Sequence, residues 1–513
     1  MTRMLLLCGF LALASGAALA QEDLFKQGVA AAQAGKTEAA IECFRQVVAQ
    51  DPRDASAASW LGYLLLKDGK PAEAVEWLQK AVTLNPRAED AYNNLGNAYM
   101  AAQQTEQAIA AYEKALAIKP DYYDARYNLA NAYLALGTGS GVEKAVKAYK
   151  EALALQPKSA EAHNNLGLAY ARLGRSYAQG RDKHLAAGDK EKAERSGREA
   201  LRFYERAIEE YQAATAADAA SGAYWLNMAL AYREILALGG GAEARQQAIN
   251  ALKKTTALRP DDYAAHLMLA DLYSEGNLLA EAIAEYSAAA RLQPAEFDPH
   301  YRLGTLYFKT GAYEPALASF QKALEIRPND ARTLNNLGCV YHNTKRYEEA
   351  LEIFTKAATV DPGFATSHAN LATVYAALGK TEESLAAWRK VIELEPRNTK
   401  ARLVLAAHYL DQDDLARAEG LYREVVAINA QSVEAHNALG YVLWRQKKVD
   451  AAIQEFNKAL QINPKHAPAL NNLGAMYEER NQIERAREMY KRALDVDPSH
   501  SDARKNLERL GSS

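Results

Sequence analysis

Residues 89–122 read EDAYNNLGNAYMAAQQTEQAIAAYEKALAIKPDY, and this 34-residue stretch determines how the rest of the chain is interpreted. Small and apolar residues with helical spacing occur in two groups, first Tyr92, Leu95, Gly96 and Tyr99, then Ala108, Tyr112 and Ala115. Pro120 ends the second group because proline has no N–H and its ring clashes with the preceding turn. The stretch therefore predicts two short helices, which must pack against neighbouring pairs to bury their apolar faces.

The same pattern recurs thirteen times in register. With Glu89 as position 1, position 8 is Gly or Ala in all thirteen copies and position 20 is Ala in every copy except Ser384. Position 24 is aromatic or Leu throughout, and position 32 is Pro in eleven copies. Small residues facing large ones at fixed offsets are what close helix packing requires. The pattern predicts a continuous stack of helix pairs over residues 21–500.

The Leu-Gly-x-x-Tyr, Ala-x-x-x-aromatic and late-proline motifs are similar to those of the tetratricopeptide repeat family, and they cover essentially all of residues 21–500. The resemblance implies an all-α fold, a right-handed α-solenoid of about thirteen tetratricopeptide helix pairs. It also implies that the first helix of each pair lines a concave groove.

The first 20 residues have a different character. Arg3 precedes an apolar core at residues 4–13, and Ala18-Leu19-Ala20 provides a small-x-small cleavage site. This arrangement predicts a secretory signal peptide, since a spanning helix needs roughly 20 apolar residues. An uncleaved signal acting as a membrane anchor is one alternative, and a lipoprotein modified at Cys8 is another. We expect a periplasmic or secreted protein with no integral membrane span after signal removal.

Several segments depart from the repeat. The first copy has Gln27 and Ala31 at apolar positions, as a capping repeat would, and residues 501–513 predict a C-terminal capping helix. Insertions fall near 137–141, 174–202 and 239–245. The glycine-rich first insertion should lengthen one turn, and the glycines at 239–241 in the third should lie in another turn. The second adds 28 residues to repeat five, rich in Ala, Lys, Arg and Glu; it predicts a taller helical hairpin, with a mobile charged loop as the alternative.

Composition and motifs argue against several functions. The formal net charge is −3 and no strongly basic block appears, so nucleic acid is not expected as a partner. No HExxH, phosphate-binding loop or Gly-x-Ser-x-Gly motif is present, which predicts neither an enzyme nor a cofactor site. Five histidines recur at position 4, namely His163, His266, His300, His368 and His436. One histidine per repeat cannot converge on a metal ion, so a structural role is favoured.

Asparagine at position 6 is the strongest candidate for a binding function. It occurs in seven copies although asparagine is a mediocre helix former, and position 5 adds five more. An amide carries donors and an acceptor, so a row of them could hold the backbone of an extended peptide. The row is similar to the asparagine ladder of O-linked N-acetylglucosamine transferases, whose catalytic domain is absent here. The alternative is that the asparagines hydrogen-bond between helices.

The predicted peptide-binding residues are Asn94, Asn128, Asn165, Asn227, Arg302, Asn336 and Asn370. Aromatic contacts are expected from Tyr63, Tyr127 and Tyr301. Met268 and Arg302 interrupt the row, and with Arg332 they form an apolar and cationic segment that could bind an acidic residue or a C-terminal carboxylate. However, no position 5 is Lys, so the carboxylate clamp of chaperone-binding tetratricopeptide domains is not predicted.

Three functions remain open from the sequence. The first is a non-enzymatic protein–protein interaction scaffold that binds an extended peptide or partner protein in its groove. The second is an assembly component of a bacterial envelope machine, such as polysaccharide export or pilus biogenesis, acting through the convex face and the repeat-five hairpin. The third is an accessory that presents substrates to a separate enzyme.

Overall fold

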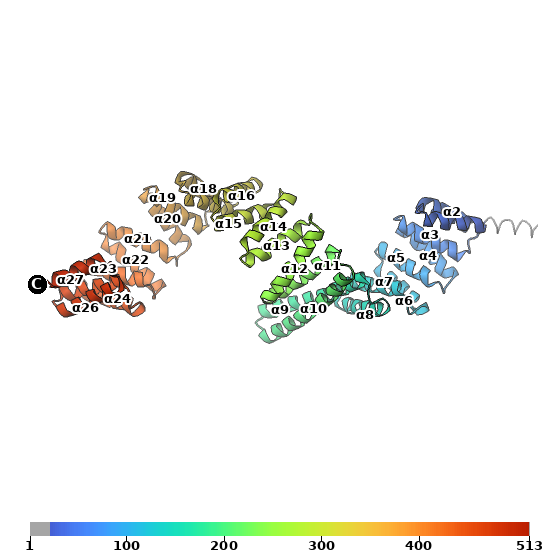
Figure 1. Ribbon diagram of the computed structural model, residues 1–513, viewed down its shortest axis with the longest axis horizontal. Helices are drawn as coiled ribbons and strands as arrows, with labels where there is room; N and C mark the ends of the chain where they lie inside the picture. The colour runs from blue at the N-terminus through green and yellow to red at the C-terminus, as the bar shows by residue number, and fades with distance from the viewer. Residues whose placement is uncertain (1–20, 512–513) are drawn as a thin grey trace, which may run out of the picture. The chain divides into compact units, whose positions relative to one another are not determined.

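The computed structural model describes residues 21–511, which form α-helices and short connecting turns and contain no strand (Figure 1). These residues belong to two compact units that divide between Leu278 and Leu279. The predicted signal peptide at residues 1–20 lies outside the described residues, as do residues 512 and 513. Within 21–511, none of the helices combines the length and the apolar character that crossing a membrane would require.

The first unit begins with a helix at residues 21–33. It continues with α2 (Thr37–Gln50), α3 (Ala55–Lys67), α4 (Pro71–Leu84), α5 (Glu89–Ala101), α6 (Thr105–Ile118), α7 (Tyr123–Ala135), α8 (Gly139–Leu155), α9 (Ala160–Ala186), α10 (Lys190–Ala217), α11 (Gly222–Ala237), α12 (Ala242–Leu258) and α13 (Tyr263–Glu275). The second unit comprises α14 (Leu279–Leu292), α15 (Phe297–Lys309), α16 (Tyr313–Ile326), α17 (Ala331–Asn343), α18 (Tyr347–Val360), α19 (Ala365–Ala377), α20 (Thr381–Leu394), α21 (Thr399–Asp411), α22 (Leu415–Ile428), α23 (Val433–Arg445), α24 (Val449–Ile462), α25 (Ala467–Glu479), α26 (Ile483–Val496) and α27 (Ser501–Gly511).

Each ordinary repeat pairs a first helix of 13 residues with a second of 14, as α5 and α6 do. The first helix packs on its own second helix and also contacts the first helix of the next repeat; α3 contacts α5, and α5 contacts α7. Each unit is therefore a solenoid of stacked helix pairs, and the predicted all-α repeat fold is confirmed.

Position 8 is small because the two helices of a repeat meet there. A Cβ built on Gly96 would lie 2.4 Å from the ring of Tyr112, the position-24 residue of the same repeat. Tyr112 is itself buried, and its hydroxyl donates to Asn97 Oδ1 at 2.7 Å. The small-against-large pattern seen in the sequence is therefore one contact, repeated along the stack.

The turn between the two helices of a repeat uses one left-handed residue. Positive φ angles occur once in each repeat, at Gly35, Gly69, Gln103, Gly137, Gly188, Gly239, Asn277, Gly311, Lys345, Gly379, Asp413, Lys447 and Asn481. Only seven of these residues are glycine, although the conformation costs other L-residues free energy.

Replacing Lys345 with glycine is therefore expected to raise stability. Lys345 has φ 60° and an exposed side chain, so the substitution relieves strain without removing packing. We expect a gain of roughly 0.5–1 kcal/mol in the free energy of unfolding of its repeat. Thermal melts would measure it. The matched variant Gly379→Ala, at φ 71°, should change stability in the opposite direction.

The insertion of repeat five is helical. α9 has 27 residues and α10 has 28, so each is 14 residues longer than the standard helix of its kind. The hairpin form expected from composition is the one observed. The insertion near 137–141 does not lengthen a turn as expected, because α8 begins at Gly139 and takes up the extra residues as a helix of 17. Thr138 caps it by accepting from the Gly141 N–H.

The capping helix expected near the C-terminus is present as α27. It buries Ala503 and Leu510 against the last repeat. Asn506 lies at position 6 of this helix and donates its amide to Asn471 of repeat thirteen at 3.1 Å, so α27 follows the register of a first helix.

Candidate functional site

The structure shows what the position-6 asparagines contact. Five of the six predicted ladder asparagines donate their amide N–H to the position-5 side chain of the preceding repeat. These bonds are Asn128 to Asn93 (3.0 Å), Asn165 to Tyr127 (2.9 Å), Asn227 to Asn164 (2.8 Å), Asn336 to Tyr301 (3.4 Å) and Asn370 to Asn335 (2.9 Å). Asn472 and Asn506 make the same bond to Asn437 and Asn471. Positions 5 and 6 thus form a side-chain latch between successive repeats.

Asn94 is the exception among the predicted residues. Its preceding repeat carries Ser59 at position 5, whose side chain is shorter than Asn or Tyr, and Asn94 has no hydrogen-bond partner among residues 21–511. Its amide instead lines a surface pocket in the first unit. Of the predicted asparagines, Asn94 is therefore the one whose donors and acceptor are all available to a ligand.

A pair of alanine variants should separate these two roles. Asn128→Ala removes a latch and leaves Asn93 Oδ1 without its donor, so we expect a loss of about 1 kcal/mol in local stability. Asn94→Ala removes no bond within the protein and should change stability by less than about 0.5 kcal/mol. Hydrogen exchange of α5 and α7 measures both; equal losses would contradict the latch interpretation.

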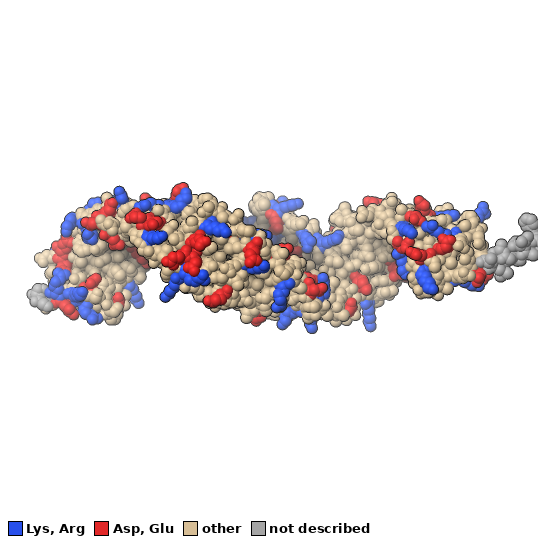
Figure 2. Space-filling model, turned by 90° about the horizontal axis from the view of Figure 1, so that it is seen from above, with Lys and Arg blue, Asp and Glu red and all other residues tan. Residues whose placement is uncertain are grey.

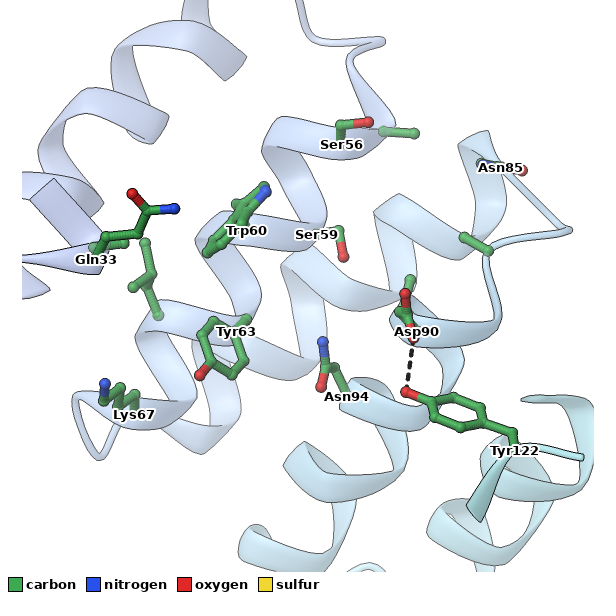
Figure 3. A pocket seen from close by; sticks show the side chains of 15 residues that line it. Gln33, Ser56, Ser59, Trp60, Tyr63, Lys67, Asn85, Asp90, Asn94 and Tyr122 are labelled. Carbon is green, nitrogen blue, oxygen red and sulfur yellow. Dashed lines mark hydrogen bonds between the residues drawn. The ribbon is translucent and has the colours of Figure 1, made fainter. Parts of the chain in front are cut away.

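The pocket has a volume of about 530 Å³ and is built from the first helices of repeats one to three together with the loops before α5 and α7 (Figure 3). We call it the N-terminal pocket. Its lining comprises Ala32, Gln33, Ala55, Ser56, Ser59, Trp60, Tyr63, Leu64, Lys67, Asn85, Ala88, Asp90, Ala91, Asn94 and Tyr122. The α3 and α5 side chains come from repeat positions 1, 2, 3, 5, 6, 9, 10 and 13, which follow one side of the helix over successive turns.

Aromatic rings form one wall of the N-terminal pocket. The Trp60 indole stacks on buried Phe44 with ring centroids 5.7 Å apart and an interplanar angle of 2°. Tyr63 meets Trp60 edge to face at 6.0 Å and is 39% exposed. Phe44 therefore holds one face of the Trp60 indole, and Trp60 lines the pocket with an N–H that has no partner among the described residues.

Opposite charges lie at the two ends of this pocket. Figure 3 shows Lys67 at one end and Asp90 at the other, with Tyr63 and Asn94 between them. Lys67 is exposed and has no ion-pair partner within the described chain. Asp90 accepts a 2.7 Å hydrogen bond from the Tyr122 hydroxyl, and burial together with this bond raises the pKa of Tyr122. The hydroxyl therefore stays protonated at neutral pH and fixes the carboxylate.

A second hollow of about 560 Å³ lies in the second unit, between α23, α25 and α27. Most of its polar groups are already paired, although Asp502 and Lys505 have no ion-pair partner among residues 21–511. Trp444 Nε1 donates to Glu479 at 2.7 Å, and Arg509 pairs with Glu478 at 2.5 Å. The N-terminal pocket differs in that its indole N–H, on Trp60, and its amide, on Asn94, both lack a partner among the described residues, as does Lys67, so it is the stronger binding candidate.

The remaining predicted residues lie elsewhere. Tyr127 and Tyr301 accept the latch bonds of Asn165 and Asn336. Arg302 is exposed on α15 in the second unit and does not line the N-terminal pocket. The sequence analysis selected Tyr63 and Asn94 as binding residues but missed Trp60, which occupies position 6 in repeat two. The sequence feature that could have indicated Trp60 is its neighbour Ser59, because position 5 carries the longer Asn or Tyr in the repeats that form latches.

The recurring histidines hold the turns between repeats. In all five, Nε2 lies 3.0–3.2 Å from the carbonyl oxygen of the residue six positions earlier, which is proline in four cases and Ala430 in the fifth. His163 Nδ1 also lies 2.6 Å from Glu210, and His436 Nδ1 lies 2.5 Å from Glu455. Each imidazole thus joins the start of a first helix to the loop before it.

Comparison with known proteins agrees with the fold. Tetratricopeptide repeat family models match residues 25–89, 96–137, 142–174 and 443–510. A model described as the Cilia and flagella-associated protein 70 C-terminal domain matches residues 237–469. The chain is a tetratricopeptide repeat protein. Repeat scaffolds of this class are generally non-catalytic and serve protein interaction.

Several solved structures are similar to parts or most of the chain. YrrB, described as a TPR protein with an unusual peptide-binding site, is 25% identical, with 37% of this chain and 97% of that chain covered and a TM-score of 0.34. The C-terminal part of a TPR repeat-containing protein from Cytophaga hutchinsonii is 19% identical, with 48% and 98% covered and a TM-score of 0.40. The APC/C hetero-tetramer Cut9–Hcn1 is 15% identical, with 96% of both chains covered and a TM-score of 0.34. No curated protein matches the chain.

Proposed function

We propose that the protein is a non-enzymatic interaction scaffold that binds an extended segment of a partner protein in the N-terminal pocket. The observation that carries the proposal is the unpaired amide of Asn94 beside the rigid Trp60–Tyr63 wall. An amide with free donors and a free acceptor can hydrogen-bond a peptide backbone in both directions. Fixed aromatic rings supply apolar contact area without a cost in ordering, which is typical of binding hot spots.

The charges define the ligand further. Lys67 is the last residue of α3 and Asp90 the second of α5, so they mark opposite ends of neighbouring first helices. A 13-residue helix is roughly 20 Å long, which corresponds to about six residues of extended chain. We therefore propose a segment of about six residues with an acidic group toward Lys67, an apolar or aromatic side chain on Trp60, and no acidic residue near Asp90.

A peptide display library tests this proposal. The purified protein is screened for binding peptides, and each is remeasured on Asn94→Ala and Asn128→Ala. We expect a family of acidic–aromatic peptides whose affinity falls about tenfold on Asn94→Ala, the loss of roughly 1.4 kcal/mol, and stays unchanged on Asn128→Ala. Lys67→Glu should reverse the charge preference at one end. Peptides that respond to Asn128→Ala and not to Asn94→Ala would overturn the assignment of the pocket.

We further propose that the scaffold acts outside the cytoplasm, on the strength of the signal sequence in residues 1–20. N-terminal sequencing of the protein recovered from a periplasmic or secreted fraction should begin at or near Gln21. Recovery of the intact Met1 terminus in the cytoplasm would contradict this localisation.

A further inference from the structure

The extension of the α9–α10 hairpin beyond Gly174 is covered only in part by the next repeat, which reaches it at Leu238. The last buried residue of α9 is Gly174, and none of the twelve helical residues that follow it is buried. Tyr177 is 41% exposed, and Leu185, at 54%, is the most exposed large apolar side chain in the described part of the chain. An ordinary repeat covers such side chains with the next pair, so this extension presents an apolar face that the fold leaves largely exposed.

A hollow of about 490 Å³ lies on this face. Leu185, Leu201 and Leu238 supply its apolar lining. Ala193 and Gly197 are small and leave room between the two helices. A Cβ at Gly197 would make only an ordinary van der Waals contact with the Arg181 side chain, at 3.4 Å, so the missing side chain leaves space open in the hollow. Two antiparallel helices with small residues between them form a groove into which the ridge of a third helix packs.

The rim of the hollow is basic. Arg181, Lys190 and Arg198 line it beside a single acidic residue, Glu194. Lys190 has no ion-pair partner among residues 21–511, and Arg198 lies 3.9 Å from Glu194. Residues 174–202 carry eight Lys or Arg against five Asp or Glu, whereas the whole chain has a net charge of −3. The hairpin is thus a positively charged projection from an acidic protein, and its charge complements an acidic partner.

We propose that the hairpin is a second docking surface, separate from the N-terminal pocket, and that it binds an amphipathic helix of a partner protein with acidic residues beside its apolar stripe. One large apolar side chain of that helix fills the hollow between Leu185, Leu201 and Leu238. Its carboxylates pair with Lys190 and Arg198. Helix-in-groove recognition supplies the affinity through the apolar contact, and the rim charges fix the orientation.

Three variants isolate the surface. Leu185→Glu replaces an exposed side chain, so it removes apolar contact and adds repulsion without touching the core. The double variant Lys190→Glu with Arg198→Glu reverses the charge of the rim. The matched control is Lys192→Glu with Arg195→Glu, which makes the same charge change on the same helix outside the hollow. Far-ultraviolet circular dichroism verifies that each variant is folded.

The probe is a display library of 16-residue peptides screened on the purified protein. We expect acidic amphipathic sequences whose affinity falls at least tenfold on Leu185→Glu and on the rim reversal, but not on the control or on Asn94→Ala. Exchanging their Glu for Lys should restore binding to the rim-reversed protein. The proposal is overturned if no selected peptide responds to the hairpin variants, if the responding peptides are basic, or if the hairpin variants change only the binding of RNA or anionic vesicles.

Discussion

Replacing Gly96 with leucine is expected to disrupt the third repeat. A Cβ alone would lie 2.4 Å from the Tyr112 ring, and the ring is buried with its hydroxyl bonded to Asn97, so it has nowhere to move. Overpacking of this kind costs typically 1–3 kcal/mol per site and more where helices must separate. We expect about 3 kcal/mol or more, which appears as a loss of roughly 150-fold in hydrogen-exchange protection over α5 and α6.

Ala110→Leu is the matched control because Ala110 is exposed on α6 and can accept the same added atoms. Repeat four places Ala130 against Tyr149 at this position, so the two helices can move apart enough for one methyl group, and Gly96→Ala should cost less than the leucine variant. If Gly96→Leu left the protection of both helices unchanged, the close contact between positions 8 and 24 would not be what sets the packing of the repeat.

Replacing Trp60 with alanine should have the largest effect on peptide binding. Trp60 is held against Phe44 and forms the wall of the N-terminal pocket, and truncating a rigid aromatic anchor costs about 2–4 kcal/mol of binding free energy. The dissociation constant of a pocket-bound peptide should therefore rise roughly 30- to 1,000-fold. Isothermal titration calorimetry with a peptide selected on the wild-type protein would measure it.

Two further variants separate binding from packing. Trp77→Ala removes the same side chain from α4 of the same repeat, outside the pocket, and should leave affinity within about twofold. Tyr63→Ala truncates a side chain that is 39% exposed, so it should weaken binding at little cost in stability. A Trp77→Ala variant that lost binding as strongly as Trp60→Ala would show that repeat stability, and not the pocket, controls affinity.

Much of the fold followed from the sequence because it depends on residue size at fixed spacing. The contact of Gly96 with Tyr112 could be predicted from the sequence, and so could the two longer helices of the 28-residue insertion. Neither prediction requires knowledge of residues far away in the chain. The sequence did not indicate that the insertion at 137–141 would extend a helix, because glycine is a poor helix former. The helix nevertheless begins at Gly139, because Thr138 caps it by accepting from the Gly141 N–H.

The site was less predictable, and the reason is the reach of side chains. Seven asparagines share position 6, and their chemistry is identical. Whether an amide is available depends on the side chain at position 5 of the preceding repeat. Asn and Tyr reach it, as Asn93 and Tyr127 do, whereas Ser59 does not. The repeated asparagine at position 6 therefore marks the latch, and the replacement of Asn or Tyr by Ser59 at position 5 marks the pocket.

The latches also determine how readily the array bends. They fall in three runs, which join repeats three to six, eight to ten, and twelve to the capping helix. Within a run, bending must break a directional polar bond, whereas the step from Ser59 to Asn94 is held by apolar contacts that tolerate small sliding. The N-terminal pocket spans this more compliant joint. A ligand that contacts both Trp60 and Asn94 would stiffen the joint, so the mechanical flexibility of the first three repeats would report occupancy.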